Sequence, residues 1–379
     1  MKHTLFLLTA MLYFQGHLGQ AQNIRARDYG IKIGVFPPGN WNAITDVAGV
    51  TVGHTTFIAG TDIRTGVTAI IPHQQDLYQY KVPAAIYIGN GFGKLTGYSQ
   101  VKELGNIETP IVLTNTLSVP EAAGALINYT LNQPGNEAVR SVNPVVGETN
   151  DGYLNDIRGR HIQEKEVLSA LASARTGPVV EGNVGAGTGT VSFGFKGGIG
   201  TASRIIPTSL GGYTVGVLVQ SNFGGVLEIN GVPIGRALKK FSFANELLNN
   251  VDGSCMIVVM TDAPLDARNL ERVAKRAMLG LAKTGGIASN GSGDYVIALS
   301  VNPKNIAALA KDGSMYSPEL LKNEAMSPLF LATIEATEEA IINALFAAET
   351  LSGKDQRQIE SIPKAQVIEL MKAYNKINE

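Results

Sequence analysis

Residues 252–262 have the sequence Asp-Gly-Ser-Cys-Met-Ile-Val-Val-Met-Thr-Asp. The apolar, β-branched run over 255–261 predicts a buried strand, and a short polar stretch with a hydroxyl precedes it. Turn chemistry alone favours a plain turn at Asp-Gly-Ser. The Ser254 hydroxyl can also attack the unhindered carbonyl of Gly253, which would cut the chain and leave Ser254 as a new N-terminus.

A serine at a new N-terminus would carry a nucleophile and a base in one residue. The α-amino group has a reference pKa of about 7.7 to 8.0, so part of it is unprotonated near neutral pH. The free amine can then take the proton of the hydroxyl, which is the pattern of an activated nucleophile. This chemistry needs neither a histidine nor a metal ion. Both interpretations of the junction remain open on these residues alone.

The rest of the chain alternates between strand and helix patterns. Residues 182–203 are rich in glycine, but no G-x-G-x-x-G element follows a strand and opens a helix over 185–200, so we expect a turn-rich loop between strands at 185–200. Residues 239–253 lose the apolar pattern and predict an exposed helix and a linker, which suits a processing site. Strands covered by long amphipathic helices predict sheets under helical layers. The predicted strands cover 50–53, 67–71, 84–88, 111–114, 213–220, 255–261 and 295–301, and the predicted helices cover 120–132, 164–175, a segment from 270 to 281 ended by Gly285-Gly286, and a segment from Ser327 to a stop at Gly353.

Two polar stretches lie at the ends of predicted strands. Asn222 follows the strand at 213–220, and its amide has two N–H donors that could serve an oxyanion, although a lone Asn is more often a turn residue. Ser292 and Asp294 place a hydroxyl and a carboxylate two positions apart, on one side of the chain if it is extended. A glycine turn is the alternative at this second stretch.

Composition excludes several classes of function. With 44% hydrophobic residues, 43 scattered glycines and a formal net charge of −1, the 379-residue chain predicts a globular protein with no attraction for nucleic acid. A single cysteine, Cys255, rules out an internal disulfide. The histidines after residue 21 are not at ligand spacing, so we expect no metal and no cofactor.

The first residues are typical of an export signal. Lys2 precedes an apolar stretch over 5–14, and small residues at Gly19 and Ala21 predict cleavage after Ala21. The apolar stretch is shorter than the roughly 20 residues that span a bilayer, which argues against an N-terminal anchor helix. We therefore expect a periplasmic or secreted protein with no membrane association.

Six segments in order resemble the DmpA-like family of self-processing aminopeptidases, which includes the L-aminopeptidase/D-esterases and the bacterial β-peptidyl aminopeptidases. Each segment alone is weak, whereas the ordered set is specific and covers nearly all of the chain after residue 21. The segments are Ile44–Thr56, Thr65–Thr68, Gly89–Gly97, Gly147–Gly152, Gly253-Ser254 and Thr261–Leu265.

The resemblance implies a precursor that is cut between Gly253 and Ser254. An α chain of residues 22–253 and a β chain of residues 254–379 would stay together as one catalytic domain. The implied fold is α+β, a four-layer αββα sandwich similar to the N-terminal nucleophile hydrolases. The implied assembly is a homotetramer of processed units.

The family's functional residues map onto five positions of this sequence. The resemblance implies Ser254 as the nucleophile, Asn222 as the oxyanion donor, and Ser292 with Asp294 as the groups that orient or relay protons beside it. Glu148 would bind the free amino group of the substrate.

Two positions depart from the family pattern. Asp294 stands where the β-aminopeptidases have glutamate, so the carboxylate is kept but is shorter by one methylene. Some relatives have a tyrosine just after the glutamate, where this chain has Thr149 and Asn150. Subsite preference is therefore not carried over.

The function that the resemblance implies is removal of the N-terminal residue from short peptides, aminoacyl amides or esters. One alternative is acyl transfer to an amine, as in ornithine acetyltransferase relatives, although these have threonine at the cleavage site. Another alternative is an exported, non-catalytic binding protein in which the junction is a turn.

Overall fold

Two β-sheets stack face to face at the centre of the computed structural model, which describes residues 24–244, 253–309 and 316–377. The larger sheet has the order β13-β3-β12-β11-β10-β9, with β4 beside β3, and the smaller has the order β1-β2-β5-β6. Only β11 with β12 and β5 with β6 are parallel among the described pairs within these sheets. The strands are β1 Thr51–Ala59, β2 Ile63–Ile71, β3 Tyr80–Gly91, β4 Asn106–Ile107, β5 Ile111–Asn115, β6 Val145–Thr149, β9 Gly198–Ile205, β10 Thr214–Asn222, β11 Ser254–Thr261, β12 Gly293–Ser300 and β13 Ala307–Ala308.

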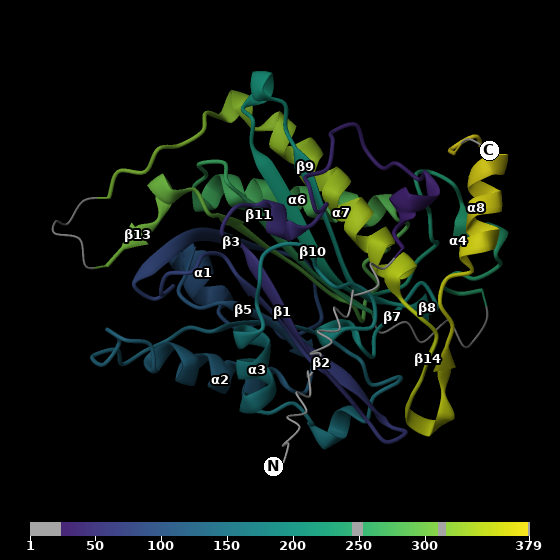
Figure 1. Cartoon of the computed structure of the whole chain (residues 1–379), viewed down its shortest axis with the longest axis horizontal. Coiled ribbons are helices and arrows are strands. Elements are labelled where there is room, and N and C mark those ends of the chain that lie inside the picture. The colour runs from purple at the N-terminus through teal and green to yellow at the C-terminus, as the bar shows by residue number, and fades with distance from the viewer. Residues whose placement is uncertain (1–23, 245–252, 310–315, 378–379) are drawn as a thin grey trace, which may run out of the picture.

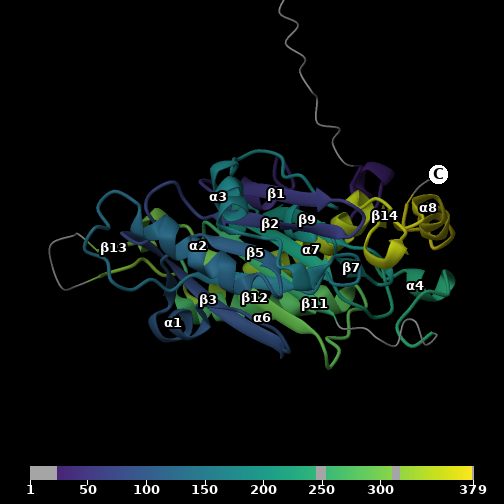
Figure 2. The same ribbon diagram turned by 90° about the horizontal axis from the view of Figure 1, so that it is seen from below.

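Helices cover the outer face of each sheet. α6 and α7 pack on the larger sheet, and α2 and α3 pack on the smaller one (Figure 1). The view from below shows α2 over the strands of the smaller sheet (Figure 2). This arrangement confirms the predicted α+β class and the four-layer αββα sandwich. The helices are α1 Tyr98–Leu104, α2 Val119–Leu131, α3 Glu164–Ala172, α4 Ile234–Ala237, α6 Ala267–Lys283, α7 Ser327–Ala347 and α8 Lys364–Ala373, and two small hairpins pair β7 Val191–Ser192 with β8 Phe195–Lys196 and β14 Leu351–Ser352 with β15 Gln358–Ile359.

Strand β11 is buried on both faces, which explains its unbroken apolar sequence. Cys255 and Ile257 belong to the core under the helices α6 and α7, whereas Met256 and Val258 belong to the core between the sheets. Because side chains alternate along a strand, Ser254 lies on the face of the larger sheet that looks toward the smaller one.

The predicted loop over 185–200 is wrong in part, because the short strands β7 and β8 lie within it and residues 198–205 form strand β9. The helix α7 packs directly on this strand, and a Cβ atom at Gly200 would collide with the carbonyl oxygen of Ala340. Glycine here reflects the close approach of a helix to a strand, which sequence patterns do not distinguish from a turn.

The long C-terminal helix ends earlier than predicted, at Ala347 instead of Gly353. The side chain of Asn183 exchanges two hydrogen bonds with the backbone of Glu349, which holds the chain extended there. Residues 239–244 do not form the predicted helix, and the rest of that prediction, over 245–252, lies outside the described residues. Strand β6, helix α1 and helix α8 were not predicted. Within the described ranges, no helix combines the length and apolarity needed to cross a membrane.

Candidate active site

Ser254 and Asn222 lie directly opposite each other at the end of the larger sheet. Strand β10 ends where the antiparallel strand β11 begins, and the register pairs Asn222 with Ser254. Directly opposed residues share one face of a sheet and have Cβ atoms about 4.5 to 5.5 Å apart. Both residues are almost fully buried, with exposed fractions of 4% and 3%. The fold therefore places an amide beside the hydroxyl that the sequence singles out.

One hydrogen bond fixes the orientation of the Asn222 amide. The backbone N–H of Val191 donates to Asn222 Oδ1 at 2.8 Å. Only an oxygen can accept this proton, so the Nδ2 group faces the other way. The amide can then offer its N–H donors on the side away from Val191.

The peptide bond before Ser254 is also held in place. The carbonyl oxygen of Gly253 accepts a hydrogen bond from the backbone N–H of Gly293 at 3.3 Å. Ser254 Oγ accepts a longer one, of 3.4 Å, from the backbone N–H of Asn150. The Gly253 carbonyl is thus directed toward β12 and away from Asn222 on β10. The Gly293 N–H on β12 therefore lies on one side of the junction, and Asn222 on β10 lies on the other.

Ser292 and Asp294 form a second polar pair beside the junction. Ser292 Oγ donates to Asp294 Oδ1 at 2.9 Å. Ser292 Oγ also lies 3.2 Å from the position that a Cβ atom on Gly253 would occupy. Burial raises the pKa of Asp294 to about 6, although the Ser292 hydroxyl and the Cys255 backbone amide oppose this shift.

The turn that carries Ser292 is fastened to strand β3. The side-chain amide of Asn90 donates to the carbonyl oxygens of Ser289 and Ser292. The pairing of β3 with β12 also has a bulge between Asp294 and Tyr295, a device that re-aims side chains near functional sites.

Glu148 lies on strand β6 of the smaller sheet, two residues before Asn150. Glu148 Oε1 accepts a hydrogen bond from the backbone N–H of Lys94 at 2.8 Å, and the side chain is only 3% exposed. Burial raises the pKa of Glu148, and the bonds from Lys94 and Thr116 partly offset this effect. A Cβ atom on Gly93 would come within 3.0 Å of Glu148 Oε1 and 2.9 Å of the Tyr295 ring, so glycine is needed there.

These contacts join the five residues that the sequence suggested into one region at one end of the two sheets. The region contains a serine hydroxyl at the first position of a strand, a fixed amide, a hydroxyl–carboxylate pair and a buried acid. This combination of groups can support acyl transfer to a serine hydroxyl.

A family model described as peptidase family S58 matches residues 42–359. The chain belongs to peptidase family S58. It is 39% identical to a β-peptidyl aminopeptidase of Sphingosinicella microcystinivorans, over 94% of each protein.

Two solved structures resemble this S58 peptidase over nearly its whole length. A β-aminopeptidase of a Burkholderia species is 39% identical with a TM-score of 0.85, and the match covers 92% of this chain and 99% of that one. An L-aminopeptidase D-Ala-esterase/amidase of Ochrobactrum anthropi, described as a prototype of the serine aminopeptidases and a variant of the N-terminal nucleophile fold, is 36% identical with a TM-score of 0.86, and the match covers 93% of this chain and 99% of that one.

Sequence reasoning missed several residues that hold the site of the S58 peptidase together. Val191, Gly293 and Asn150 act through backbone N–H groups, which leave no signal in the sequence. Asn90 stands in the Gly-Asn-Gly of a matching segment, and Lys196 in the glycine-rich stretch is fully buried. The available signals were the position of Asn90 in a matching segment and the presence of a lysine within an apolar, glycine-rich stretch.

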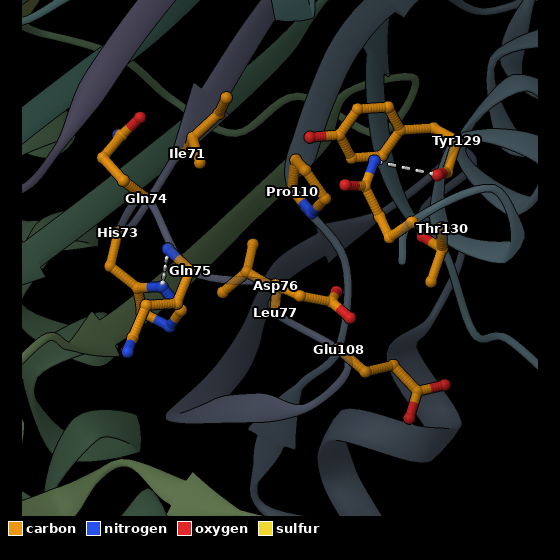
Figure 3. A pocket seen from close by; sticks show the side chains of 11 residues that line it. Ile71, His73, Gln74, Gln75, Asp76, Leu77, Glu108, Pro110, Tyr129 and Thr130 are labelled. Atoms are coloured by element: carbon orange, nitrogen blue, oxygen red, sulfur yellow. Dashed lines mark hydrogen bonds between the residues drawn. The ribbon is translucent and has the colours of Figure 1, made fainter. Parts of the chain in front are cut away.

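A cavity of about 80 Å³ lies at the opposite end of the smaller sheet from the site. Figure 3 shows Asp76, Glu108 and Tyr129 around this cavity, beside the start of β5. None of the five candidate residues lines it.

No group of three or more His, Cys, Asp or Glu side chains that could hold a metal ion occurs in the described part of the S58 peptidase.

Proposed function

We propose that this S58 peptidase cuts itself between Gly253 and Ser254 and then acts as an aminopeptidase through the new N-terminal serine. The observation that carries this proposal is the junction itself. A Gly-Ser bond lies at the head of a buried strand, with its carbonyl held by Gly293 and its serine opposite Asn222. The relatives named as aminopeptidases support the same activity.

Self-cleavage is an acyl shift followed by hydrolysis. Ser254 Oγ forms a bond to the Gly253 carbonyl carbon while the Gly253–Ser254 C–N bond breaks, and the hydroxyl proton ends on the released amine. The Gly293 N–H stabilises the negative charge that develops on the Gly253 oxygen. Water then hydrolyses the ester, which leaves a carboxylate on Gly253 and a free amine and hydroxyl on Ser254.

Aminopeptidase turnover has two steps, acylation of the Ser254 hydroxyl and hydrolysis of the acyl enzyme. The Ser254 amine takes the Oγ proton, Oγ attacks the carbonyl carbon of the substrate's first residue, and the amide N–H of Asn222 holds the oxyanion. The Ser254 ammonium gives this proton to the leaving amine as the amide C–N bond breaks. Water then attacks the acyl enzyme, the Ser254 amine takes a proton from the water, and Oγ receives this proton as the ester bond breaks. Ser292, which donates to Asp294, can accept an N–H of the Ser254 amine and so direct its lone pair toward Oγ.

Glu148 explains why an N-terminal residue is removed. Glu148 is buried two residues before Asn150, whose N–H contacts Ser254 Oγ, and a carboxylate there favours a substrate ammonium group, which an internal peptide bond does not have. Short peptides and aminoacyl amides or esters are the proposed substrates, with β-aminoacyl groups among them because two of the relatives are β-aminopeptidases. A panel of α, β and D aminoacyl p-nitroanilides tests this choice.

Replacing Glu148 with glutamine should lower kcat/KM about 10- to 100-fold, chiefly through KM, because a charge-assisted hydrogen bond of about 1.5 to 3 kcal/mol is lost. Steady-state kinetics on an aminoacyl anilide measure this change. Self-cleavage should remain complete on a denaturing gel, since the precursor binds no substrate amine. An unchanged KM would remove Glu148 from substrate binding.

Turnover should decline as the pH falls through about 6, because protonation of Asp294 removes the negative charge that strengthens its hydrogen bond from Ser292. In Asp294→Asn, kcat should be lower at pH 8, and the step near pH 6 should be absent from its profile. The folded-state pKa is raised above that of the unfolded chain, so ionised Asp294 costs stability above about pH 6. Thermal melting should therefore show that the Asn variant gains stability relative to wild type as pH rises from 4 to 7. If kcat of both wild type and Asp294→Asn changed near pH 6, the titration would belong to a group other than Asp294.

Hydrolysis is favoured over acyl transfer because the junction carries serine, whereas the acetyltransferase relatives have threonine. Release of p-nitroaniline without an added amine acceptor distinguishes the two. Export through residues 1–21, which lie outside the described residues, and assembly as a homotetramer of processed units remain part of the proposal. The sequenced N-terminus of the α chain and the mass of the native enzyme test them.

A further inference from the structure

Lys196 is a fully buried lysine that the mechanism above does not use. It ends the short hairpin strand β8, and none of its side chain is exposed. Its Nζ donates to three backbone carbonyl oxygens, those of Gly187 at 3.0 Å, Thr190 at 2.9 Å and Gly197 at 2.8 Å. An ammonium group has three N–H donors and no acceptor, so three carbonyl partners fit the charged form.

The charge on Lys196 has a buried counterpart. Burial lowers the pKa of Lys196 to about 7, whereas the carboxylate of Asp151 opposes this shift. Asp151 is itself only 2% exposed and follows Asn150, the residue whose N–H contacts Ser254 Oγ. Burial also raises the pKa of Asp151 to about 7, so the three carbonyl oxygens are the main partners that offset the cost of desolvating the Lys196 charge.

One peptide group connects Lys196 to the candidate oxyanion donor. The carbonyl of Thr190, which accepts from Lys196 Nζ, belongs to the same peptide unit as the N–H of Val191. That N–H donates to Asn222 Oδ1 at 2.8 Å. A positive charge at the carbonyl end polarises the peptide and strengthens its N–H as a donor. The N–H in turn polarises the Asn222 amide in the same sense, because hydrogen bonds in a chain reinforce one another.

The path from Lys196 through the Thr190–Val191 peptide to Asn222 is called the relay below. The β7–β8 hairpin that carries it is fixed against strand β10. Phe193 N–H donates to the Phe223 carbonyl at 2.8 Å, and the hydroxyls of Ser192 and Ser221 are 2.8 Å apart. The rings of Phe193 and Phe223 pack edge to face with centroids 5.0 Å apart. Left-handed backbone at Phe193 and Gly194, with φ of 53° and 76°, makes the tight turn that this pairing needs. The relay therefore has a defined geometry.

We propose that Lys196 is a positioning residue for the oxyanion donor: through the Thr190–Val191 peptide, its charge holds the Asn222 amide in the productive orientation and strengthens its N–H donors. This inference rests on the proposed role of Asn222. It predicts an effect on the transition state, where the oxyanion forms, and little effect on substrate binding.

Lys196→Met removes the charge and keeps the length of the side chain. We expect kcat to fall about 10- to 100-fold, less than after loss of the donor itself, with KM within about threefold of wild type. The same substitution in an Asn222→Ala background should cost little further activity, since a residue that acts through another shows a non-additive effect. An aldehyde analogue of an aminoacyl substrate, which forms a tetrahedral adduct with the serine, should lose affinity in proportion to kcat/KM.

Ser192→Ala is the matched control, because it removes a buried hydrogen bond of the same hairpin and leaves the relay intact. Its kcat should stay within about threefold of wild type, and a loss equal to that of Lys196→Met would mean that only hairpin stability matters. Folding of each variant is checked by thermal melting. If Lys196→Met does not fold, Lys196→Gln, which keeps two N–H donors without the charge, takes its place.

A folded Lys196 variant with wild-type kcat would overturn the inference, as would full additivity with Asn222→Ala. Failure of the proposed function has a different signature. In that case the wild-type enzyme would show no self-cleavage and no release of p-nitroaniline, whatever residue stands at position 196.

Discussion

Replacing Ser254 with alanine is expected to leave one uncleaved chain with aminopeptidase activity lowered by about 10⁴-fold or more, the scale on which loss of a nucleophile acts. Alanine keeps the strand and its packing but has no hydroxyl to attack the Gly253 carbonyl. Ser254 is 3% exposed and lies at the head of β11, so the loss of one oxygen should leave the fold intact. A denaturing gel and intact mass measurement show whether one or two chains are present.

Ser254→Cys is the control for this experiment, since a thiol retains a nucleophile at the same position. We expect it to process, at a reduced rate, into two chains. N-terminal sequencing of wild type should find the β chain beginning at Ser254 and the α chain beginning at Gln22. Two bands from the alanine variant would refute self-cleavage at this bond, and an active but uncleaved wild-type enzyme would refute the role of the new N-terminus.

Asn222→Ala should lower kcat about 10²- to 10³-fold with little change in KM, the usual result of losing one oxyanion donor. The register of β10 with β11 pairs Asn222 with Ser254, and the bond from Val191 turns the N–H donors of the amide away from Val191. Self-cleavage should be affected less, because the Gly253 carbonyl is held by Gly293 on the other neighbouring strand. Steady-state kinetics and the rate at which the precursor disappears measure these two effects separately.

Ser221→Ala provides the comparison on the same strand. Ser221 is the neighbour of Asn222 but points to the other face of the sheet, where its hydroxyl meets that of Ser192. We expect its kcat to remain within about threefold of wild type, as for a lost hydrogen bond of modest net value. Equal losses in both variants would show that the end of β10 matters only for stability, and that Asn222 has no role in holding an oxyanion.

Sequence patterns located most of the elements that frame the site. Continuous apolar runs predicted the central strands β10 and β11 because both of their faces are buried, and apolar spacing with terminal glycines predicted α6. These patterns failed at β9 because its glycines are required by the close packing of helix α7. They failed at β6 because a five-residue strand that contains Glu148 shows no alternating apolar pattern. Both failures arise where a distant segment, and not local periodicity, selects the residues.

The sequence by itself determined the membership of the peptidase family and singled out the junction at which we propose cleavage. A small residue before a hydroxyl, at the head of an apolar strand, is a local property, and the ordered segments from Ile44 to Leu265 are readable without a structure. The resemblance had already suggested the side chains of the site, and the tertiary structure alone decided how they are oriented and which backbone groups join them. Asn222 is close to Ser254 through strand register, Gly293 and Val191 contribute backbone N–H groups, and Lys196 acts through a peptide unit. Nearly every residue has a backbone N–H, so the residue type does not show which of these groups lie at the site. Their partners are fixed only when the strands have paired.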